Sequence, residues 1–364
     1  YMSIGTEITR LADAKSAIAT AIAGKGVTVP NGTKLDGMAA LIGSIANQAE
    51  IESISVKTPP VKLDYISGDA FDPSGLVLTV HIGEMEIDIT SGYTITPETM
   101  AADTTAVTIS FTAGGKTVST TQAVTVKVYD PVLSNNSWEK IIDACESGDA
   151  SELWAAGDIS PTVELHGQTV AFRIIGFNHD DLDTTDAKYG DASYNNGSNK
   201  AAVTFDIVNT IVDSSGTGWV YNANLSGSTS PYWQKSTLKT KTLPAVLALF
   251  PEALKNSIKT VQKKTYRVPW DSPTLHQTAD QLFLLSQDEI ATRGKGEGTI
   301  YSYYAAGNSR AKTKVDGSVS SYYLRGPSLN NDYSNLVGLI MGTAGTITSV
   351  NGTYTYPLSF AFCL

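Results

Sequence analysis

The stretch AVTISFTAGGKTVSTTQAVTVKV, residues 106–128, decides the fold class of this chain. Val107, Ile109 and Phe111 alternate with Thr and Ser, a Gly-Gly pair follows, and apolar residues return from Val118 to Val128. A two-residue apolar period interrupted by a glycine turn is typical of a β-hairpin that buries one face. The stretch therefore predicts antiparallel β-structure.

The same alternation extends over residues 51–129, where Leu76, Leu78 and Val80 are expected on one side of a strand. Short strands with turn residues between them, over about 80 residues, are typical of an immunoglobulin-like β-sandwich. The Cys pair and the Trp of antibody domains are absent, so the pattern predicts the broader sandwich class over residues 50–130.

The segment before the sandwich, residues 1–49, has a helical pattern. Residues 6–23 are Ala-rich with apolar residues at helical spacing, a glycine- and proline-containing link follows, and residues 35–45 indicate a second short helix. Two helices of this size cannot bury a core alone. We therefore expect the segment to drive assembly, with a homotrimer as the expected state.

Residues 131–364 combine helical and strand patterns. A helix is predicted from Trp138 to Cys145 behind the cap candidate Ser137, and another over residues 236–254 with restarts at two prolines. Strands are predicted at 169–177, 202–208, 282–285 and 358–364, and Ser286 opens a capping-box match with Glu289. The pattern predicts an α+β domain, so the fold class of the whole chain is mixed and mainly β.

The composition limits the classes of partner. The 364 residues carry 26 Lys and Arg against 36 Asp and Glu, a net charge of −10, so the chain offers no broad basic face for nucleic acid or anionic lipid. No apolar stretch approaches the ~20 residues that cross a bilayer, so no membrane insertion is expected. Charges at Arg10, Asp13 and Lys15 interrupt any signal-peptide core, which predicts synthesis in the cytoplasm. Cys145 and Cys363 lack the spacing of a disulfide framework or metal site and are expected to be buried.

One acidic run is the strongest candidate for chemistry. Residues 178–186, NHDDLDTTD, place four carboxylates beside His179. Such a run can bind calcium, supply an acid and a base, or form a solvated turn with local hydrogen bonds. The spacing does not match an EF-hand loop, so Asp180, Asp181 and Asp183 are only weak metal candidates. No cofactor, metal or catalytic residue is expected, and the chain is not predicted to be an enzyme.

Three stretches resemble known families. Residues 8–18 (ITRLADAKSAI) and 24–30 (GKGVTVP) resemble the N-terminal segment of tail proteins from phages of Gram-positive bacteria. Residues 51–129 resemble the bacterial immunoglobulin-like modules of phage and cell-surface proteins. Residues 131–364 resemble C-type-lectin-like domains of phage tail and gut-bacterial surface proteins, through WEKII (138–142), VAFRIIGFNHD (170–180), YWQKS (232–236), DQLFLLS (280–286), YYLRGP (322–327) and FAFCL (360–364).

The resemblance implies a function. Such chains are tail-fibre or tail-tip adhesins, so the chain is expected in the virion, with other tail proteins and a host-surface protein or glycan as partners. A virion-associated depolymerase that cuts surface polysaccharide and a bacterial surface adhesin are the alternatives. The runs with which sugar-binding lectins hold calcium and a hexose are absent, so calcium-dependent sugar binding is not implied.

Some members of that family are varied by retroelements that convert AAY codons into NNY codons, which cannot encode Lys, Glu, Gln, Met or Trp. Residues 315–364 contain none of the chain's 20 Lys, 13 Glu, 8 Gln and 5 Trp, and one Met, Met341. Avoidance of helix formers by a segment rich in strands and turns is the other explanation. Tyr, Ser, Gly and Asn, in which the segment is rich, are also the residues of antibody loops.

The predicted binding face lies in this segment. Leu324, Leu336, Val337, Ile340, Phe360 and Phe362 are expected to form the scaffold beneath it. The ligand-binding residues are predicted to be Tyr323, Asn330, Asn331, Asp332, Tyr333, Ser334, Thr343, Thr346, Thr348, Asn351, Thr353 and Thr355.

Overall fold

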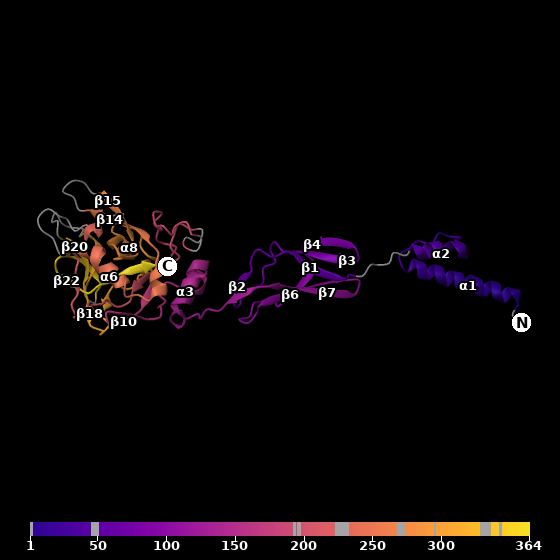
Figure 1. Cartoon of the computed structure of the whole chain (residues 1–364), viewed down its shortest axis with the longest axis horizontal. Coiled ribbons are helices and arrows are strands. Elements are labelled where there is room, and N and C mark those ends of the chain that lie inside the picture. The colour runs from indigo at the N-terminus through magenta and orange to yellow at the C-terminus, as the bar shows by residue number, and fades with distance from the viewer. Residues whose placement is uncertain are drawn as a thin grey trace. The chain divides into compact units, whose positions relative to one another are not determined.

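The computed structural model describes residues 3–44, 51–191, 194, 198–222, 233–267, 274–294, 296–327, 336–341 and 344–364. The chain forms two compact units, one up to Val128 and one from Tyr129 onward. The first unit holds two helices and strands β1 to β8, and the second holds all later elements (Figure 1). The fold is mixed and mainly β, as predicted. No helix among the described residues is both long and apolar enough to cross a membrane.

The two N-terminal helices are confirmed. Helix α1 spans Ile4–Ala23 behind the cap residue Ser3, whose Oγ accepts a hydrogen bond from the Thr6 amide at 3.2 Å, and α2 spans Leu35–Gly43. Among the described residues of this segment only Ile22 and Met38 have buried apolar side chains. The helices therefore leave most of their apolar surface exposed.

Residues 53–127 form a small β-sandwich. One sheet has the order β1-β3-β4 and the other the order β5-β6-β7, while β2 pairs with β8 in parallel. The strand bounds are Ser53–Thr58 (β1), Asp64–Ile66 (β2), Val77–Ile82 (β3), Met85–Ile89 (β4), Tyr93–Thr96 (β5), Ala106–Ala113 (β6), Lys116–Ala123 (β7) and Thr125–Lys127 (β8).

The predicted alternation sets the core of the sandwich. Val107 and Ile109 of β6 are fully buried, and Leu76, Leu78 and Val80 are buried in the same cluster. Strands β6 and β7 pair through the turn at Gly114 and Gly115, whose φ angles of +61° and +80° favour glycine. The hairpin prediction from residues 106–128 is confirmed.

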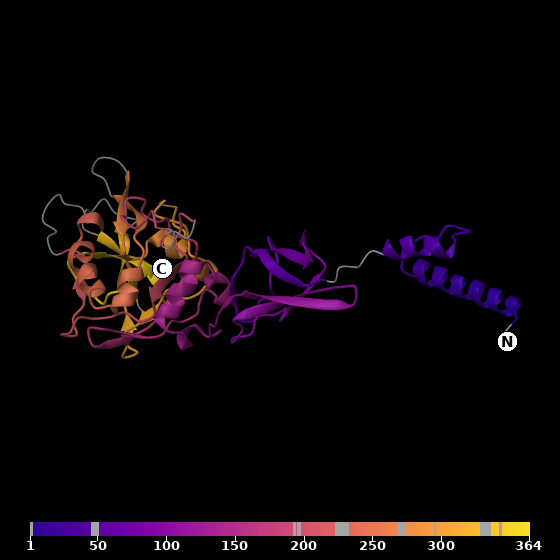
Figure 2. The same cartoon turned by 45° about the vertical axis from the view of Figure 1, so that its right-hand side comes forward.

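The second unit is built around a four-stranded sheet with the order β11-β12-β23-β16. These strands span Phe172–Phe177, Val203–Ile207, Ala361–Cys363 and Leu282–Phe283 respectively. The predicted strand at 169–177 is divided between β10 (Gln168–Val170) and β11, because Ala171 lies outside both ladders. The last strand of the chain thus pairs at the centre of the sheet, and Figure 2 shows it, in yellow, among the other elements of this unit.

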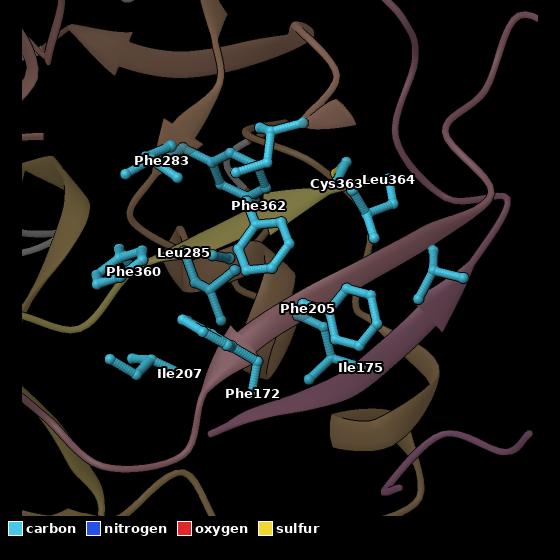
Figure 3. Packing of buried hydrophobic residues seen from close by; sticks show 14 of the residues in the cluster. Phe172, Ile175, Phe205, Ile207, Phe283, Leu285, Phe360, Phe362, Cys363 and Leu364 are labelled. Carbon is cyan, nitrogen blue, oxygen red and sulfur yellow. The ribbon is translucent and has the colours of Figure 1, made fainter. Parts of the chain in front are cut away.

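Aromatic side chains fill the core of this sheet. The ring of Phe362 lies 4.9 Å from that of Phe172 and 5.4 Å from that of Phe205, measured between centroids. These side chains come from β23, β11 and β12 and gather in one cluster (Figure 3). Leu324, Phe360 and Phe362 are buried as predicted for the scaffold, and Cys145 and Cys363 are buried free thiols. The side chains of Leu336, Val337 and Ile340 lie outside the described residues.

Helices surround the sheet. The predicted helix at Trp138 is α3 (Trp138–Ser147), capped by Ser137, and the predicted capping box at Ser286 opens α8 (Gln287–Ala291). The helix predicted over residues 236–254, with restarts at Pro244 and Pro251, is found as three short pieces, and the two prolines lie at the starts of the second and third. These pieces are the π-helical η3 (Leu238–Thr242), α6 (Leu243–Leu247) and α7 (Glu252–Ser257). The remaining helices are η1 (Leu133–Asn135), α4 (Ala150–Leu153), η2 (Trp233–Lys235) and α9 (Ser302–Ala305).

Several small sheets complete the unit. Strands β19 (Tyr322–Pro327), β20 (Leu336–Met341) and β21 (Thr346–Asn351) form one antiparallel sheet, and β14 (Val261–Arg267) pairs with β15 (Thr274–Asp280). The β14–β15 hairpin was not predicted from the sequence. The other pairs are β9 (Val163–Leu165) with β10, β13 (Trp219–Val220) with β22 (Thr355–Tyr356), and β17 (Lys312–Thr313) with β18 (Val319–Ser320).

Candidate binding sites

The predicted binding face is partly described by the structure. Thr346 and Thr348 of β21, Thr353 of the following turn and Thr355 of β22 all have exposed side chains. Asn351 is half-buried, and its Oδ1 accepts hydrogen bonds from the amide and the hydroxyl of Thr353 at 3.0 and 2.9 Å. The exposed threonines therefore remain available to a ligand, whereas Asn351 orders the turn between them.

Six of the predicted residues lie outside the described part of the chain. They are Asn330, Asn331, Asp332, Tyr333, Ser334 and Thr343.

Tyr323 is not on an exposed face, so its placement among the ligand-binding residues is corrected. Its side chain is 3% exposed, and its hydroxyl donates to the carbonyl oxygens of Tyr354 and Asn351 at 2.5 and 3.3 Å. The ring contacts those of Tyr221 and Tyr356. Tyr354, in contrast, is 59% exposed. Tyr323 thus supports the turn from below while Tyr354 faces solvent.

Arg325 fixes strand β19, which neighbours this face. Its guanidinium is fully buried and donates to both carboxylate oxygens of Glu289 at 3.0 Å. It also donates to the carbonyl oxygens of Leu284, Lys264 and Glu297 at 2.7, 3.1 and 3.0 Å. A bidentate pair with every donor engaged holds geometry better than a point charge does. The frame beside the exposed face is therefore rigid.

Lys263 extends this buried charge network from β14. Its ammonium contacts Asp180, Glu289 and the hydroxyl of Tyr301, the last two at 3.1 and 2.9 Å. Burial by itself would raise the pKa of Asp180, but the Lys263 ammonium and His179 beside it hold that pKa well below its ordinary value. Burial opposes the charge on Lys263, yet Asp180 and Glu289 raise its pKa. Asp180 and Lys263 are therefore both ionised and bound to each other in an ion pair.

The acidic run at residues 178–186 does not form one site. Asp180 joins the Lys263 network, Asp181 pairs with Lys200 at 2.5 Å, and Asp183 accepts hydrogen bonds from the amide and hydroxyl of Thr185 at 3.2 and 2.8 Å. Over the described residues, no group of three or more His, Cys, Asp or Glu side chains is arranged to hold a metal ion. The three aspartates that were weak metal candidates have separate local roles instead.

A polar pocket of about 520 Å³ opens beside the Lys263 network. His179 lies at its wall, with its ring tilted against that of Tyr301, 3.9 Å away between centroids, and its Nε2 2.9 Å from the Thr299 hydroxyl. Further walls come from β14 and β15, through Gln262, Lys264 and Gln277, and from the glycine-rich loop at 296–299, which carries Glu297. This pocket has the size of a small-molecule site. Sequence reasoning missed it because the residues come from six separate segments.

A second buried lysine also escaped the sequence analysis. The Lys312 ammonium lies 2.7 Å from both carboxylate oxygens of Asp206, 2.7 Å from the Ser359 hydroxyl and 2.6 Å from the Ile207 carbonyl oxygen. The Tyr304 hydroxyl donates to the same carboxylate at 2.7 Å. All donors of the ammonium are therefore satisfied inside the unit, which is typical of a structural ion pair.

Residues 202–363 match the model of a protein family described as a domain of unknown function, DUF6273. The matched range includes Lys263, Glu289 and Arg325 of the network, while Asp180 lies before it. Comparison with curated proteins and with solved structures found no match.

Proposed function

We propose that the chain is a phage tail receptor-binding protein that recognises a host-surface ligand through the exposed residues of its C-terminal segment. One observation carries the proposal: exposed Thr346, Thr348, Thr353 and Tyr354 lie on a strand and a turn, and the turn rests on the buried, hydrogen-bonded Tyr323 of β19. A surface that changes specificity needs this division, because exposed positions tolerate substitution and core positions do not.

The composition of the segment supports the same proposal. Residues 315–364 lack Lys, Glu, Gln and Trp, which fits diversification at AAY codons, and they supply the Tyr, Ser, Asn and Gly of adaptable binding loops. On this proposal the partner is a protein or glycan of the host surface, the location is the virion, and the C-terminal unit is a C-type-lectin-like domain.

The charge pairing does not favour the alternative of a polysaccharide depolymerase. Glycoside hydrolysis needs a protonated carboxyl and a second carboxylate that face the same bond. Asp180 and Glu289 are instead each bound by a buried cation, and Asp183 caps its own turn. These three carboxylates therefore do not supply the catalytic pair that hydrolysis needs.

The N-terminal helices are proposed to assemble the protein into a homotrimer and to join it to other tail proteins. Ile4, Ile8 and Leu11 of α1 are 83%, 63% and 54% exposed. At 100° per residue these three lie on one side of the helix, opposite Thr6 and Thr9. An apolar stripe of this kind is stabilised by covering it with another helix.

Adsorption of the full chain to bacteria tests the receptor-binding proposal. Labelled protein is incubated with a panel of strains, and binding is compared with that of a variant with Ala at Thr346, Thr348, Thr353 and Thr355. The control variant has Ala at four exposed threonines of the sandwich, Thr105, Thr108, Thr121 and Thr125. We expect the first variant to lose adsorption and the control to retain it. Equal adsorption of both variants would place the receptor site elsewhere.

A further inference from the structure

Most charged residues that line the polar pocket form ion pairs with one another, but one buried carboxyl group does not. Lys263 is bound by Asp180 and Glu289, and Lys200 is bound by Asp181. Glu289 also accepts from Arg325, which is not part of the lining. The two remaining charged residues of the lining are Glu297 and Lys264. Lys264 has an exposed side chain at the pocket rim, whereas Glu297 is 2% exposed. The interior of the pocket therefore holds one carboxyl group that no described residue neutralises in an ion pair.

Glu297 is held in a fixed position, and no residue that the structure describes forms an ion pair with it. Its amide donates to Asp288 Oδ2 at 3.0 Å, and its carbonyl oxygen accepts from Arg325 Nη2 at 3.0 Å. Its Oε1 accepts from the Tyr266 amide at 2.8 Å, but Oε2 accepts no hydrogen bond from any residue that the structure describes. The Arg325 guanidinium is already engaged by Glu289 and three carbonyl oxygens, so it does not satisfy this oxygen.

We propose that this pocket binds an organic cation, a primary ammonium or a guanidinium group, against the Glu297 carboxylate. A buried carboxylate with a free lone pair is stabilised most by a donor that also carries charge. A metal ion would need several such ligands, and no suitable group exists among the described residues. Gln262, Gln277 and Thr299 add neutral hydrogen-bonding groups along the walls for the rest of the ligand. The inference concerns a site separate from the threonines of the proposed receptor face and does not depend on that proposal.

Binding at this site should depend on pH. The charged and titratable groups near Glu297 are Asp288 and Glu289 of α8, Arg325 of β19, Tyr266 of β14 and the buried Tyr221. Lys264 lines the same pocket. Burial, partly offset by Arg325, raises the pKa of Glu297 to about 7. The cation needs the ionised form, whose fraction rises from about one tenth at pH 6 to about nine tenths at pH 8, so affinity should rise close to tenfold.

Isothermal titration calorimetry of the full chain with small probes at pH 8 tests the proposal. The charged probes are Nα-acetyl-lysine methylamide and Nα-acetyl-arginine methylamide, which represent a protein ligand, and 2-aminoethyl glucoside, an alkyl amine that stays protonated at pH 8 and represents a glycan. Nα-acetyl-norleucine methylamide and glucose are their neutral counterparts. We expect at least one charged probe to bind and its neutral counterpart to bind about tenfold more weakly or not at all. Failure of all three charged probes, or equal binding of the neutral compounds, would overturn the proposal.

Three variants locate the binding. Glu297→Gln should lower the affinity for the probe by about tenfold or more, since the substitution removes the charge and keeps the shape of the side chain. Lys264→Gln should raise that affinity a few-fold, because it removes a positive charge that repels the cationic probe. Glu152→Gln on α4, which changes an exposed carboxylate outside the pocket lining, should leave it unchanged. Wild-type affinity for Glu297→Gln would overturn the proposal. If that variant does not fold, the wild-type titrations at pH 6 and pH 8 decide, and an affinity that is flat or falls with pH refutes it.

Discussion

At the scale of single residues, the C-terminal unit depends on charges that its own core neutralises. Glu289 accepts from Arg325 through both oxygens and from Lys263 through one, and all three side chains are buried. Removal of one partner of a buried pair leaves an uncompensated charge, which costs more than the pair contributes relative to apolar residues. Substitution of Arg325 should therefore destabilise the unit strongly.

We expect Arg325→Leu to lower the free energy of unfolding of the second unit by about 3–5 kcal/mol, because Glu289 would remain charged in the core. Calorimetric melting of the full chain measures the effect. Arg293→Leu, which changes an exposed arginine near α8, should alter stability by less than about 0.5 kcal/mol. If both variants melt like the wild type, the Arg325–Glu289 pair does not stabilise the unit.

Glu297 gives stability a defined dependence on pH. Burial raises its pKa from 4.5 to about 7, so between these pH values the folded chain holds a proton that the unfolded chain has released. Stability is therefore greatest below about pH 4.5 as far as this group is concerned, and it falls by about 3 kcal/mol as the pH rises past 7. Glu297→Gln should remove this fall. Urea unfolding at pH 5 and pH 8 would contradict the assignment if both proteins lost equal stability.

Part of this chemistry could be predicted from sequence and part could not. The acidic run at 178–186 was identified as unusual, but its three candidate aspartates act separately, because Asp180 turns inward to Lys263 while Asp181 pairs at the surface. Partners such as Asp180 and Lys263 are 83 residues apart, and no local pattern reports such a distance. Tyr323 was misplaced for a related reason, since a tyrosine serves equally well as an exposed anchor or as a buried donor.

At the scale of elements, patterns with a clear period or cap were predicted well. The β6–β7 hairpin follows from its alternation and glycine turn, and α8 follows from its capping box. The β14–β15 hairpin was missed, because Lys263 and Thr265 are buried at positions where the pattern requires apolar residues. Lys263 is paired in the core, so the structure satisfies it by contacts that the sequence does not reveal.

One glycine controls the pairing of two of these elements. A Cβ at Gly218 would lie 2.2 Å from the carbonyl carbon of Tyr356, where β13 approaches β22. The backbone must move to admit it, so Gly218→Ala should destabilise the unit by about 1–3 kcal/mol. Gly190→Ala is the matched control, because no atom lies within 4 Å of its added Cβ. Equal melting temperatures for the two variants would show that the contact between β13 and β22 can accommodate the added Cβ.

At the scale of the whole molecule, the N-terminal helices lack a core of their own. We expect Ile8→Asp combined with Leu11→Asp to convert the proposed trimer into monomers, because the charges fall on the exposed apolar stripe of α1. Thr6→Asp combined with Thr9→Asp places the same charges on the opposite side and should leave assembly intact. Light scattering coupled to gel filtration gives the mass of each. A trimer that survives the first pair of substitutions would place the assembly contacts in the later parts of the chain.

The last expectation separates binding from folding within the C-terminal unit. Tyr354 is 59% exposed, and its carbonyl oxygen, which accepts from Tyr323, remains when the side chain is removed. Phe360 is fully buried and its ring packs on Phe172 and Phe250. Aromatic anchors dominate many interfaces, so Tyr354→Ala should reduce adsorption to host cells by about tenfold with little change in melting temperature. Phe360→Ala should cost about 3–5 kcal/mol and lower that temperature by roughly 10 °C.

Adsorption and melting of both variants, measured on the same preparations, decide between two placements of the receptor site. If Tyr354→Ala binds host cells as the wild type does while Phe360→Ala melts early, the C-terminal segment is a frame without a receptor site on its described strands. The loop at residues 178–199 would then be the next candidate, because it carries exposed Asp181 and contributes His179 to the polar pocket. Loss of adsorption through Tyr354 alone would instead tie recognition to the exposed side chains that can vary without disturbing Tyr323 beneath the turn.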